Sequence, residues 1–333
     1  SDRSVLMFLN TLLSEEGKML ENLCFCLNAT LPVFLMLFLG MFFMRLRVFD
    51  DAFVKKINDF VFKVPLPVLV FSDLCGEDFY SLWDTKYVLF CFFSTLASIA
   101  LVFLLSLFLR DKSRQGEFIQ ASYRSSAALL GVTLMQNVYG SSAMAPLMII
   151  GCVPLYNIAA VIILAFFQPE RKPLDKKLLL STGKGIVTNP IILGIACGLL
   201  WALLKLPMPE ILGKTVDGIA GLATPLGLMA MGASFNMQKA FRSAKAAGLA
   251  ASVKLIVLCA IFIPAAAAMG FRQEKLAAIL IMCGSPTTVS SYVMARSMGH
   301  EGTLTSSTIM LTTLFCALTL TFWLFLLKSL SLL

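Results

Sequence analysis

The chain has 333 residues, of which 58% are hydrophobic and only 14% are charged. A soluble globular domain has about 45 to 50% apolar and about 25% charged residues, so this chain has too few charges to cover a surface that faces water. The composition therefore excludes an ordinary soluble protein and predicts a polytopic membrane protein. The formal net charge of +8 does not indicate a nucleic-acid partner, because Lys and Arg lie in short clusters between long apolar runs.

A helix that crosses a membrane needs about 20 mostly apolar residues. Six windows of that size contain no Asp, Glu, Lys or Arg: 24–44, 87–109, 185–204, 218–238, 276–295 and 302–327. The uncharged run 125–169 holds the end of one further helix and the whole of the next. The segments 54–74 and 246–269 are two more spans that carry charge. The sequence thus predicts ten membrane-spanning helices.

The loops between these spans differ in charge. Sixteen of the 27 Lys and Arg residues lie in one alternating set of loops, and eight lie in the other set and at the two ends. Basic residues concentrate on the cytoplasmic side of membrane proteins. We therefore expect both termini on the non-cytoplasmic side of the cell membrane.

Ten spans divide into two halves of five, and an odd number inverts the second half in the membrane, as in many secondary transporters. Both halves have an Asn and a Pro near the start of the first helix and a proline within the second: Asn28 with Pro32, Asn189 with Pro190, then Pro67 and Pro225. We predict residues 1–23 as an N-terminal tail or an interfacial helix, 24–168 as the first five-helix repeat, 169–185 as a cytoplasmic linker and 186–333 as the second five-helix repeat.

The fourth helix of each half contains residues that interrupt a helix. These are Gly131-Val132-Thr133 in the fourth span and Gly284-Ser285-Pro286-Thr287-Thr288 in the ninth. Ser285 before Pro286 predicts an N-cap and the first residue of a new half-helix. Broken backbone is tolerated in a membrane only where it is buried or lines a cavity, and the free N–H groups of a half-helix attract anions. The alternative is a simple proline kink.

Two cations fall within predicted helices, where a charge costs about 2.5 to 3.5 kcal/mol at the helix centre. Arg124 lies towards one end of the fourth helix, and we expect it to snorkel to the cytoplasmic surface. Lys254 is near the middle of the eighth. A functional role for one or both cations is to raise the positive potential for an anionic substrate or to pair with backbone carbonyls freed at the breaks, and we expect such a role for Lys254. No Asp or Glu lies deep in the ten predicted helices to pair with either cation.

The sequence contains few of the residue patterns that enzymes use for catalysis or metal binding. Most cysteines lie inside apolar runs and no two form a Cys-x-x-Cys pair, so we expect no disulfide framework, no zinc and no cofactor. The only histidine, His300, falls in a short predicted loop, where we expect it to be solvated, and no His-Glu-x-x-His motif is present.

Several segments together resemble the auxin efflux carrier family, which includes plant PIN carriers and bacterial malate and malonate permeases. They are the Pro65-Leu66-Pro67 segment, the Asn189-Pro190 opening of the sixth helix, the Gly-Leu-Met-Ala-Met-Gly run within 222–234, and the break at Gly284-Ser285-Pro286 followed by Val293-Met294-Ala295-Arg296. Members of the family usually have a proline at the break of the fourth helix, where this chain has Thr133.

The resemblance implies a scaffold of helices one, two, six and seven and a mobile bundle of the other six, within a homodimer. The broken fourth and ninth helices would cross near the bilayer centre and hold a small organic anion. The candidate substrate-binding residues are Gly131, Thr133, Asn137, Lys254, Gly284, Ser285, Pro286, Thr287 and Thr288.

The function expected from this resemblance is secondary transport of a carboxylate, such as an auxin-like acid or a dicarboxylate, by elevator-type alternating access. The coupling ion, H⁺ or Na⁺, stays open. The alternative is a sodium-coupled bile-acid-type symporter of related crossed-helix fold, which would have more acidic and Asn or Gln ligands around the breaks.

Overall fold

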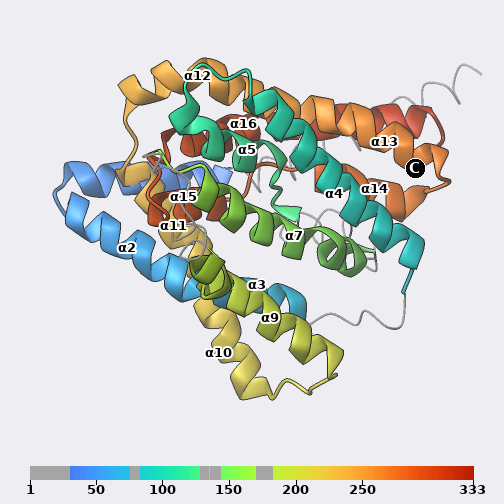
Figure 1. Ribbon diagram of the computed structural model, residues 1–333, viewed down its shortest axis with the longest axis horizontal. Helices are drawn as coiled ribbons and strands as arrows, with labels where there is room; N and C mark the ends of the chain where they lie inside the picture. Colours follow the sequence, from blue (N-terminus) through green and yellow to red (C-terminus); the bar gives the residue numbers. More distant parts are fainter. Residues whose placement is uncertain (1–30, 76–82, 128–134, 136–143, 170–182) are drawn as a thin grey trace, which may run out of the picture.

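The computed structural model describes residues 31–75, 83–127, 135, 144–169 and 183–333, and this part of the chain contains helices and no strand (Figure 1). The first helix is Leu31–Arg45. It is followed by α2 (Asp51–Lys63), α3 (Pro65–Cys75), α4 (Thr85–Ser106), the 3₁₀ turn η1 (Lys112–Arg114), α5 (Gln115–Tyr123), α7 (Ala145–Phe166) and α9 (Pro190–Leu203). The rest of the chain forms α10 (Glu210–Ala220), α11 (Ala223–Ala233), α12 (Met237–Ser252), the π-helical turn η2 (Val253–Val257), α13 (Leu258–Ala268), α14 (Gln273–Gly284), α15 (Ser290–Ser297) and α16 (Thr303–Ser329).

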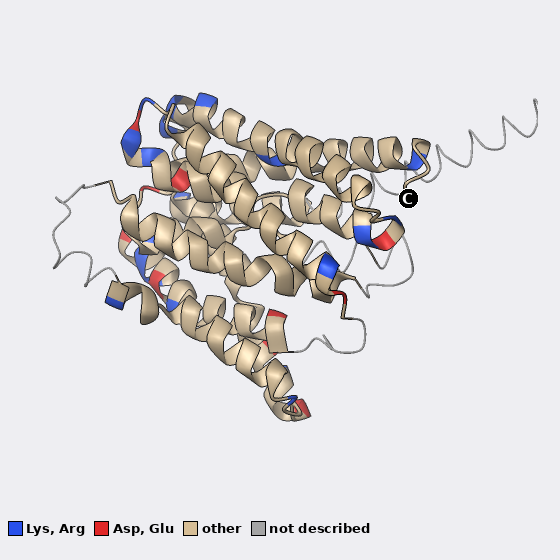
Figure 2. Cartoon of the chain, turned by 45° about the vertical axis from the view of Figure 1, so that its right-hand side comes forward, with Lys and Arg blue, Asp and Glu red and all other residues tan. Residues whose placement is uncertain are grey.

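Five helices are long and apolar enough to cross a membrane: Thr85–Ser106, Ala145–Phe166, Glu210–Ala233, Met237–Ala268 and Thr303–Ser329. Two apolar helices, Leu31–Arg45 and Pro190–Leu203, are shorter. Most charged residues gather towards the ends of the helices and leave long uncharged stretches between them (Figure 2). The prediction of an all-helical membrane protein is confirmed for the described part of the chain, with five helices long enough to span a membrane.

The second predicted span of each half is divided into two helices. The segment 54–74 forms α2 and α3, which separate at Val64, and 218–238 includes the end of α10 and the whole of α11, which separate at Gly221 and Leu222. In both cases a proline, Pro67 or Pro225, is the third residue of the second helix. Proline lacks the N–H group that an inner turn would use, but the first turn of a helix does not use it. A new helix therefore begins close to each proline.

Glycines bring the helices of the two predicted halves into close contact. A Cβ atom added to Gly40 would lie 2.1 Å from the carbonyl oxygen of Met229 in α11, and one added to Gly232 of α11 would lie 2.1 Å from the carbonyl oxygen of Leu37. In the same way, a Cβ atom on Gly194 of α9 would lie 2.5 Å from the carbonyl oxygen of Pro67 in α3. Small residues allow such close approach of membrane helices. The first helix of each predicted half thus packs against the second helix of the other.

The remaining helices form a second group. Helix α4 packs along α7, α12 packs along α16, and α5 lies against α4, α7, α12 and α16. The shorter helices α14 and α15 pack within this group, and α15 also contacts α2 and α11 of the first group (Figure 1). The interrupted helices are therefore surrounded by other helices, and α15 meets the first group.

Replacing Gly40 with alanine is expected to destabilise the protein by about 1 to 3 kcal/mol, because the new methyl group overlaps the backbone of α11. Thermal unfolding in detergent measures the effect. Gly248 of α12 is a matched control, since a Cβ atom there meets nothing within 4 Å. Gly248→Ala is expected to leave stability unchanged or to raise it slightly. Equal effects of the two substitutions would contradict this description of the packing.

Candidate functional site

The ninth predicted helix is interrupted as the sequence predicted, but the second half begins later. Helix α14 ends at Gly284 and α15 begins at Ser290. Ser285 has an extended backbone, with φ −72° and ψ 158°, because Pro286 excludes the helical conformation from the residue before it. The prediction that Ser285 caps a half-helix starting at Pro286 was wrong. Residues 285–289 instead form a non-helical segment between α14 and α15.

The fourth predicted helix is also interrupted, earlier than expected. Helix α5 ends at Tyr123, Arg124 is extended with φ −70° and ψ 136°, and helical backbone is found again at Ala127. The predicted interruption at Gly131 and Thr133, and the candidate Asn137, lie outside the described residues. This chain therefore breaks the helix around Arg124 without a proline at that position.

The two interruptions contact each other directly. The backbone N–H of Ser126 donates to the carbonyl oxygen of Pro286 at 2.9 Å. The Thr287 hydroxyl donates to the carbonyl oxygen of Ala121 at 2.7 Å, and the Gln120 amide nitrogen donates to that of Ser291 at 2.9 Å. Backbone groups that lack a partner within their own helix are thus hydrogen-bonded across the contact. In a membrane they need such partners, because the hydrocarbon offers no water to bond with.

Helix α16 completes the support of the second interruption. The backbone N–H of Thr287 donates to the Thr312 hydroxyl at 3.1 Å, and that hydroxyl donates to the carbonyl oxygen of Thr308 at 2.8 Å. Four candidate residues from the sequence, Gly284, Ser285, Pro286 and Thr287, therefore lie at the contact between the two interruptions. Thr288 lies beside it, and its hydroxyl is 3.2 Å from that of Ser290.

Lys254 is fully buried and reaches the end of α14. Its ammonium group donates to the carbonyl oxygens of Cys283 at 2.6 Å and Met282 at 3.3 Å, and to the Ser125 hydroxyl. Ser125 in turn donates to the carbonyl oxygen of Met282. The last carbonyls of a helix have no intrahelical partner and carry partial negative charge, which a cation stabilises. Lys254 thus pairs with carbonyls freed at a break, one of the two roles expected from the sequence.

The π-helical turn η2 positions Lys254 within the long helix Met237–Ala268. In this turn the N–H of Leu258 donates to the carbonyl oxygen of Val253, one residue further back than in an α-helix. Such π-helical turns are rare in proteins, and those that occur often lie at functional sites. The sequence offered no signal for the π-turn.

Arg124 is 2% exposed and lies in the interruption itself. Its guanidinium donates to the Asn157 side-chain oxygen at 2.7 Å, to the Ser290 hydroxyl at 2.9 Å and to the sulfur of Met294 at 2.7 Å. The expectation that Arg124 snorkels to the surface was wrong, because α5 ends one residue earlier and the extended backbone directs the side chain inward. The sequence identified Arg124 as a cation within a predicted helix, but it did not predict that Arg124 lies in the break itself.

The Arg124 guanidinium retains unused bonding capacity. No carboxylate pairs with it, and its Nε–H finds no partner, within the described part of the chain. The Ser285 and Ser291 hydroxyls and the Gln120 side-chain oxygen are likewise buried without partners there. Buried polar groups are usually bonded, and those that are not often mark a binding site. A partly desolvated cation with free donors is suited to binding an anion.

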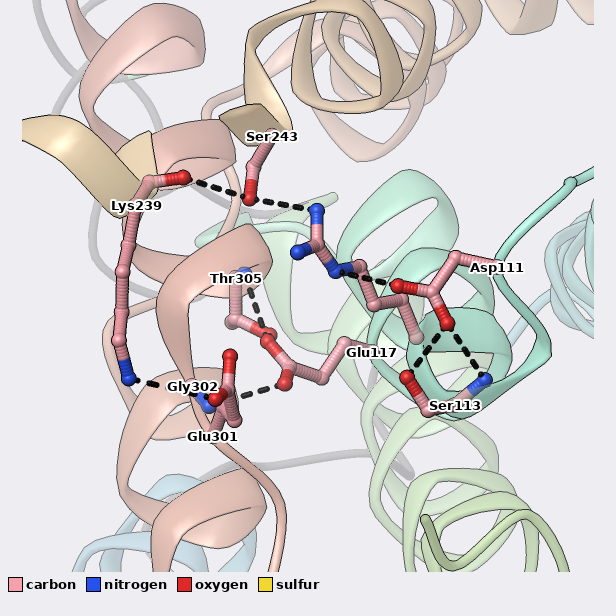
Figure 3. A network of polar contacts seen from close by, with 9 residues as sticks. Asp111, Ser113, Glu117, Lys239, Ser243, Glu301, Gly302 and Thr305 are labelled. Carbon is pink, nitrogen blue, oxygen red and sulfur yellow. Dashed lines mark hydrogen bonds and ion pairs between the residues drawn. The ribbon is translucent and has the colours of Figure 1, made fainter. Parts of the chain in front are cut away.

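A second polar network lies at the start of α5 (Figure 3). The buried Glu117 carboxylate accepts hydrogen bonds from the backbone N–H groups of Gly302 at 2.9 Å and Thr305 at 3.0 Å, and from the Thr305 hydroxyl at 3.0 Å. Gly302 has a left-handed backbone, with φ 72°, as α16 begins. Glu117 thus supplies the N-terminal partner of a helix distant in sequence, which the sequence pattern did not indicate.

Neighbouring residues connect this network to α12. Arg114 pairs with Asp111 at 3.0 Å and donates to the Ser243 hydroxyl at 2.9 Å (Figure 3). The hydroxyl and backbone N–H of Ser113 donate to Asp111 and lower the pKa of its carboxyl group. The expectation of a solvated His300 was wrong. It is 2% exposed, and its Nε2 atom lies 3.0 Å from the carbonyl oxygen of Leu164.

The family described as "Membrane transport protein" matches residues 25–324. The chain belongs to this family. The resemblance to the auxin efflux carriers is thereby confirmed. A protein of Rhizobium meliloti (strain 1021) named "Putative malonate transporter" is 26% identical over 306 residues, which cover 90% of this chain and 95% of the relative. The protein is accordingly a multi-pass membrane transporter, and both findings indicate transport rather than an enzymatic reaction.

Replacing Lys254 with methionine is expected to lower stability by about 1 to 3 kcal/mol, because the carbonyls of Met282 and Cys283 lose a charge-assisted donor. Thermal unfolding in detergent measures this. Lys245, exposed in the same long helix, is the matched control, and Lys245→Met is expected to have almost no effect. A Lys254→Met protein as stable as the Lys245→Met protein would show that Lys254 does not support the break.

Proposed function

We propose that this transporter moves a small organic anion, a carboxylate, by elevator-type alternating access, and that the anion binds where the two interrupted helices cross. The name of the Rhizobium meliloti relative supports a carboxylate, since malonate carries two such groups. The family supports transport itself. Neither comparison identifies the binding residues, which are inferred from the geometry of the site.

The observation that supports the proposal most directly is that the Arg124 guanidinium is buried and not fully hydrogen-bonded among the described residues. A guanidinium presents donors in a planar fork that matches a carboxylate. Among the described residues the guanidinium is buried, donates to neutral groups and has an Nε–H without a partner. A cation deprived of water without a counter-ion is costly, so a bound carboxylate would recover much of the lost interaction. Asn157 orients the fork, because its amide nitrogen is itself fixed on the Val153 carbonyl oxygen at 3.0 Å.

The start of α15 supplies a second set of donors. Helix N-termini attract anions through unpaired N–H groups and the helix dipole. Ser290, the first residue of α15, already contacts Arg124, and Thr288 lies beside it. We assign Gly284, Ser285, Pro286 and Thr287 to the backbone that shapes this end, and Thr288 to direct contact with the anion. Lys254 supports the end of α14 on the other side of the crossing.

The packing supports the transport mechanism that we propose. The first group, which includes Leu31–Arg45, α3, α9 and α11, is joined by close glycine contacts and forms the scaffold. The second group, with α4, α5, α7, α12, α14 and α16, carries the crossing and moves as a bundle. The reciprocal glycine contacts and the paired prolines Pro67 and Pro225 support two inverted five-helix repeats. A homodimer and outward-facing termini rest on the family resemblance and the loop charges alone.

The bile-acid-type alternative is less well supported. The residues that surround Arg124 in the described part of the chain are Asn157, Ser290 and Met294, and none of them is acidic. A sodium site would gain from carboxylates there, whereas an anion site gains from their absence. The family and the relative also point away from this alternative.

Replacing Arg124 with glutamine is expected to weaken carboxylate binding by at least about thirtyfold, because truncating one side of a buried charged pair costs about 2 to 5 kcal/mol. The measurement is the thermal shift of the purified protein against malonate concentration, since a ligand that binds only the native state stabilises it in proportion to ln(1 + [L]/Kd). Arg124→Lys, which keeps the charge but not the fork, is expected to retain weak binding.

Arg114→Gln is the matched control for these measurements. Arg114 precedes the same helix but pairs with Asp111 away from the crossing, so its loss should leave malonate binding unchanged. Undiminished binding by a folded Arg124→Gln protein would refute the proposed site. Stabilisation by cations or neutral solutes and by no carboxylate would refute the proposed substrate class.

A further inference from the structure

Three ionic side chains are almost completely buried in the described part of the chain: Glu117, Arg124 and Lys254. All three lie within or against the helices of the bundle that carries the crossing. Residues 128–134 and 136–143, which lie outside the described part of the chain, contain no charged residue in their sequence. The balance of these three charges therefore determines what charge a bound substrate must carry.

Two of the three ions are balanced by helix ends. Glu117 accepts two backbone N–H groups and one hydroxyl at the start of α16, where the helix dipole is positive. Lys254 donates to two carbonyls at the end of α14, where the dipole is negative. Each ion thus has partial charges of opposite sign around it, supplied by the backbone.

Arg124 has no such partner. Its acceptors are an amide oxygen, a hydroxyl and a thioether, which carry no net charge, and its Nε–H has no acceptor among the described residues. The crossing therefore offers one uncompensated positive charge. One carboxylate neutralises that charge, whereas a second carboxylate would enter a buried site without a counter-ion, at a large desolvation cost.

We infer that the site takes its substrate as a singly charged anion, so that a dicarboxylate such as malonate binds with one carboxyl group protonated. The inference rests on the proposed function and adds the charge state of the substrate to it. The proton comes from solution with the substrate and moves across the membrane on it. One proton therefore accompanies each dicarboxylate, and no side chain of the protein has to carry it.

The substrate is the titrating group in this scheme. The elements packed around Arg124 also carry titratable or charged side chains: Glu117 and Tyr123 on α5, Tyr156 on α7, Lys254 on η2, Cys283 on α14, and Arg296 and His300 at and after the end of α15. A test must therefore separate titration of the substrate from titration of these groups. A permanent monoanion of the same size does so, because its own charge stays constant.

The experiment compares malonate with monomethyl malonate by thermal shift on the full-length protein, from about pH 5 to about pH 8. The monoester keeps one negative charge over this range, and malonate loses its second proton within it. The fraction of hydrogen malonate falls about tenfold per pH unit above the second pKa of malonic acid. We expect the apparent Kd for malonate to rise by the same factor, while the Kd for the monoester stays constant.

Each outcome decides the inference. Malonate binding that is constant or tightens as the pH rises, with steady binding of the monoester, would overturn the single-charge inference and leave the anion site standing. A parallel loss of both ligands would also overturn it, since a protein group would then be titrating. If neither ligand binds at any pH, the proposed carboxylate function itself fails, and the inference fails with it.

A near-isosteric variant tests the charge balance separately. Asn157→Asp places a carboxylate 2.7 Å from the guanidinium and removes the free positive charge. We expect it to lose binding of malonate and of the monoester by at least tenfold, while the Arg114→Gln control, which leaves the crossing unchanged, retains binding of both. Undiminished binding of the monoester by Asn157→Asp would contradict the inference.

Discussion

Backbone groups cannot remain unpaired in hydrocarbon, and this constraint explains the centre of the molecule. Two helices are interrupted there, and each interruption satisfies the other. The N–H of Ser126 donates to the Pro286 carbonyl oxygen, and Thr287 donates to that of Ala121. Since neither segment could stay extended in the membrane alone, the two breaks depend on each other. A change that restores helix in one would leave polar groups of the other without partners.

The crossing also explains where charge is tolerated. Lys254 lies against the free carbonyls at the end of α14, and Glu117 lies against the free N–H groups at the start of α16. Helix ends within or near the membrane thus act as counter-charges for ionic side chains. Arg124 differs, because it lies in an extended segment between helices and its partners are neutral. The same backbone geometry that buries the guanidinium leaves it available to a ligand.

The sequence predicted what depends on composition and on single residues with strong backbone preferences. Apolar windows located the long helices, and Asn189 with Pro190 marked the start of α9, where Asn189 accepts the Ile191 N–H. Pro286 located the break in the ninth helix, because proline restricts its own backbone and that of the residue before it.

Features that depend on contacts between distant segments were missed. Nothing near Arg124 in the sequence excludes a helix, and the break there is stabilised by Pro286, about 160 residues away in the chain. The helix after the ninth break starts only at Ser290, and Thr312 of α16 accepts the N–H of Thr287 in the segment before it. His300 and Glu117 are likewise buried because α7 and the start of α16 pack against them. Local patterns carry no information on such partners.

The arrangement also relates binding to movement. Arg124 follows α5 directly, Lys254 lies in η2, and their partners Asn157, Ser290 and Cys283 belong to helices of the same bundle. A substrate held by these groups would travel with the bundle without exchanging ligands. The scaffold, in contrast, is joined by backbone contacts at Gly40, Gly194 and Gly232, which leave no room for sliding without a loss of packing. Close packing within the first group and bonding across the breaks in the second group are consistent with the elevator mechanism that we propose, in which the two groups would move against each other where α15 meets α2 and α11. In the proposed mechanism the positive charge of Arg124 favours an anion as substrate, because an empty bundle would carry that charge unpaired through the membrane while a loaded one would not.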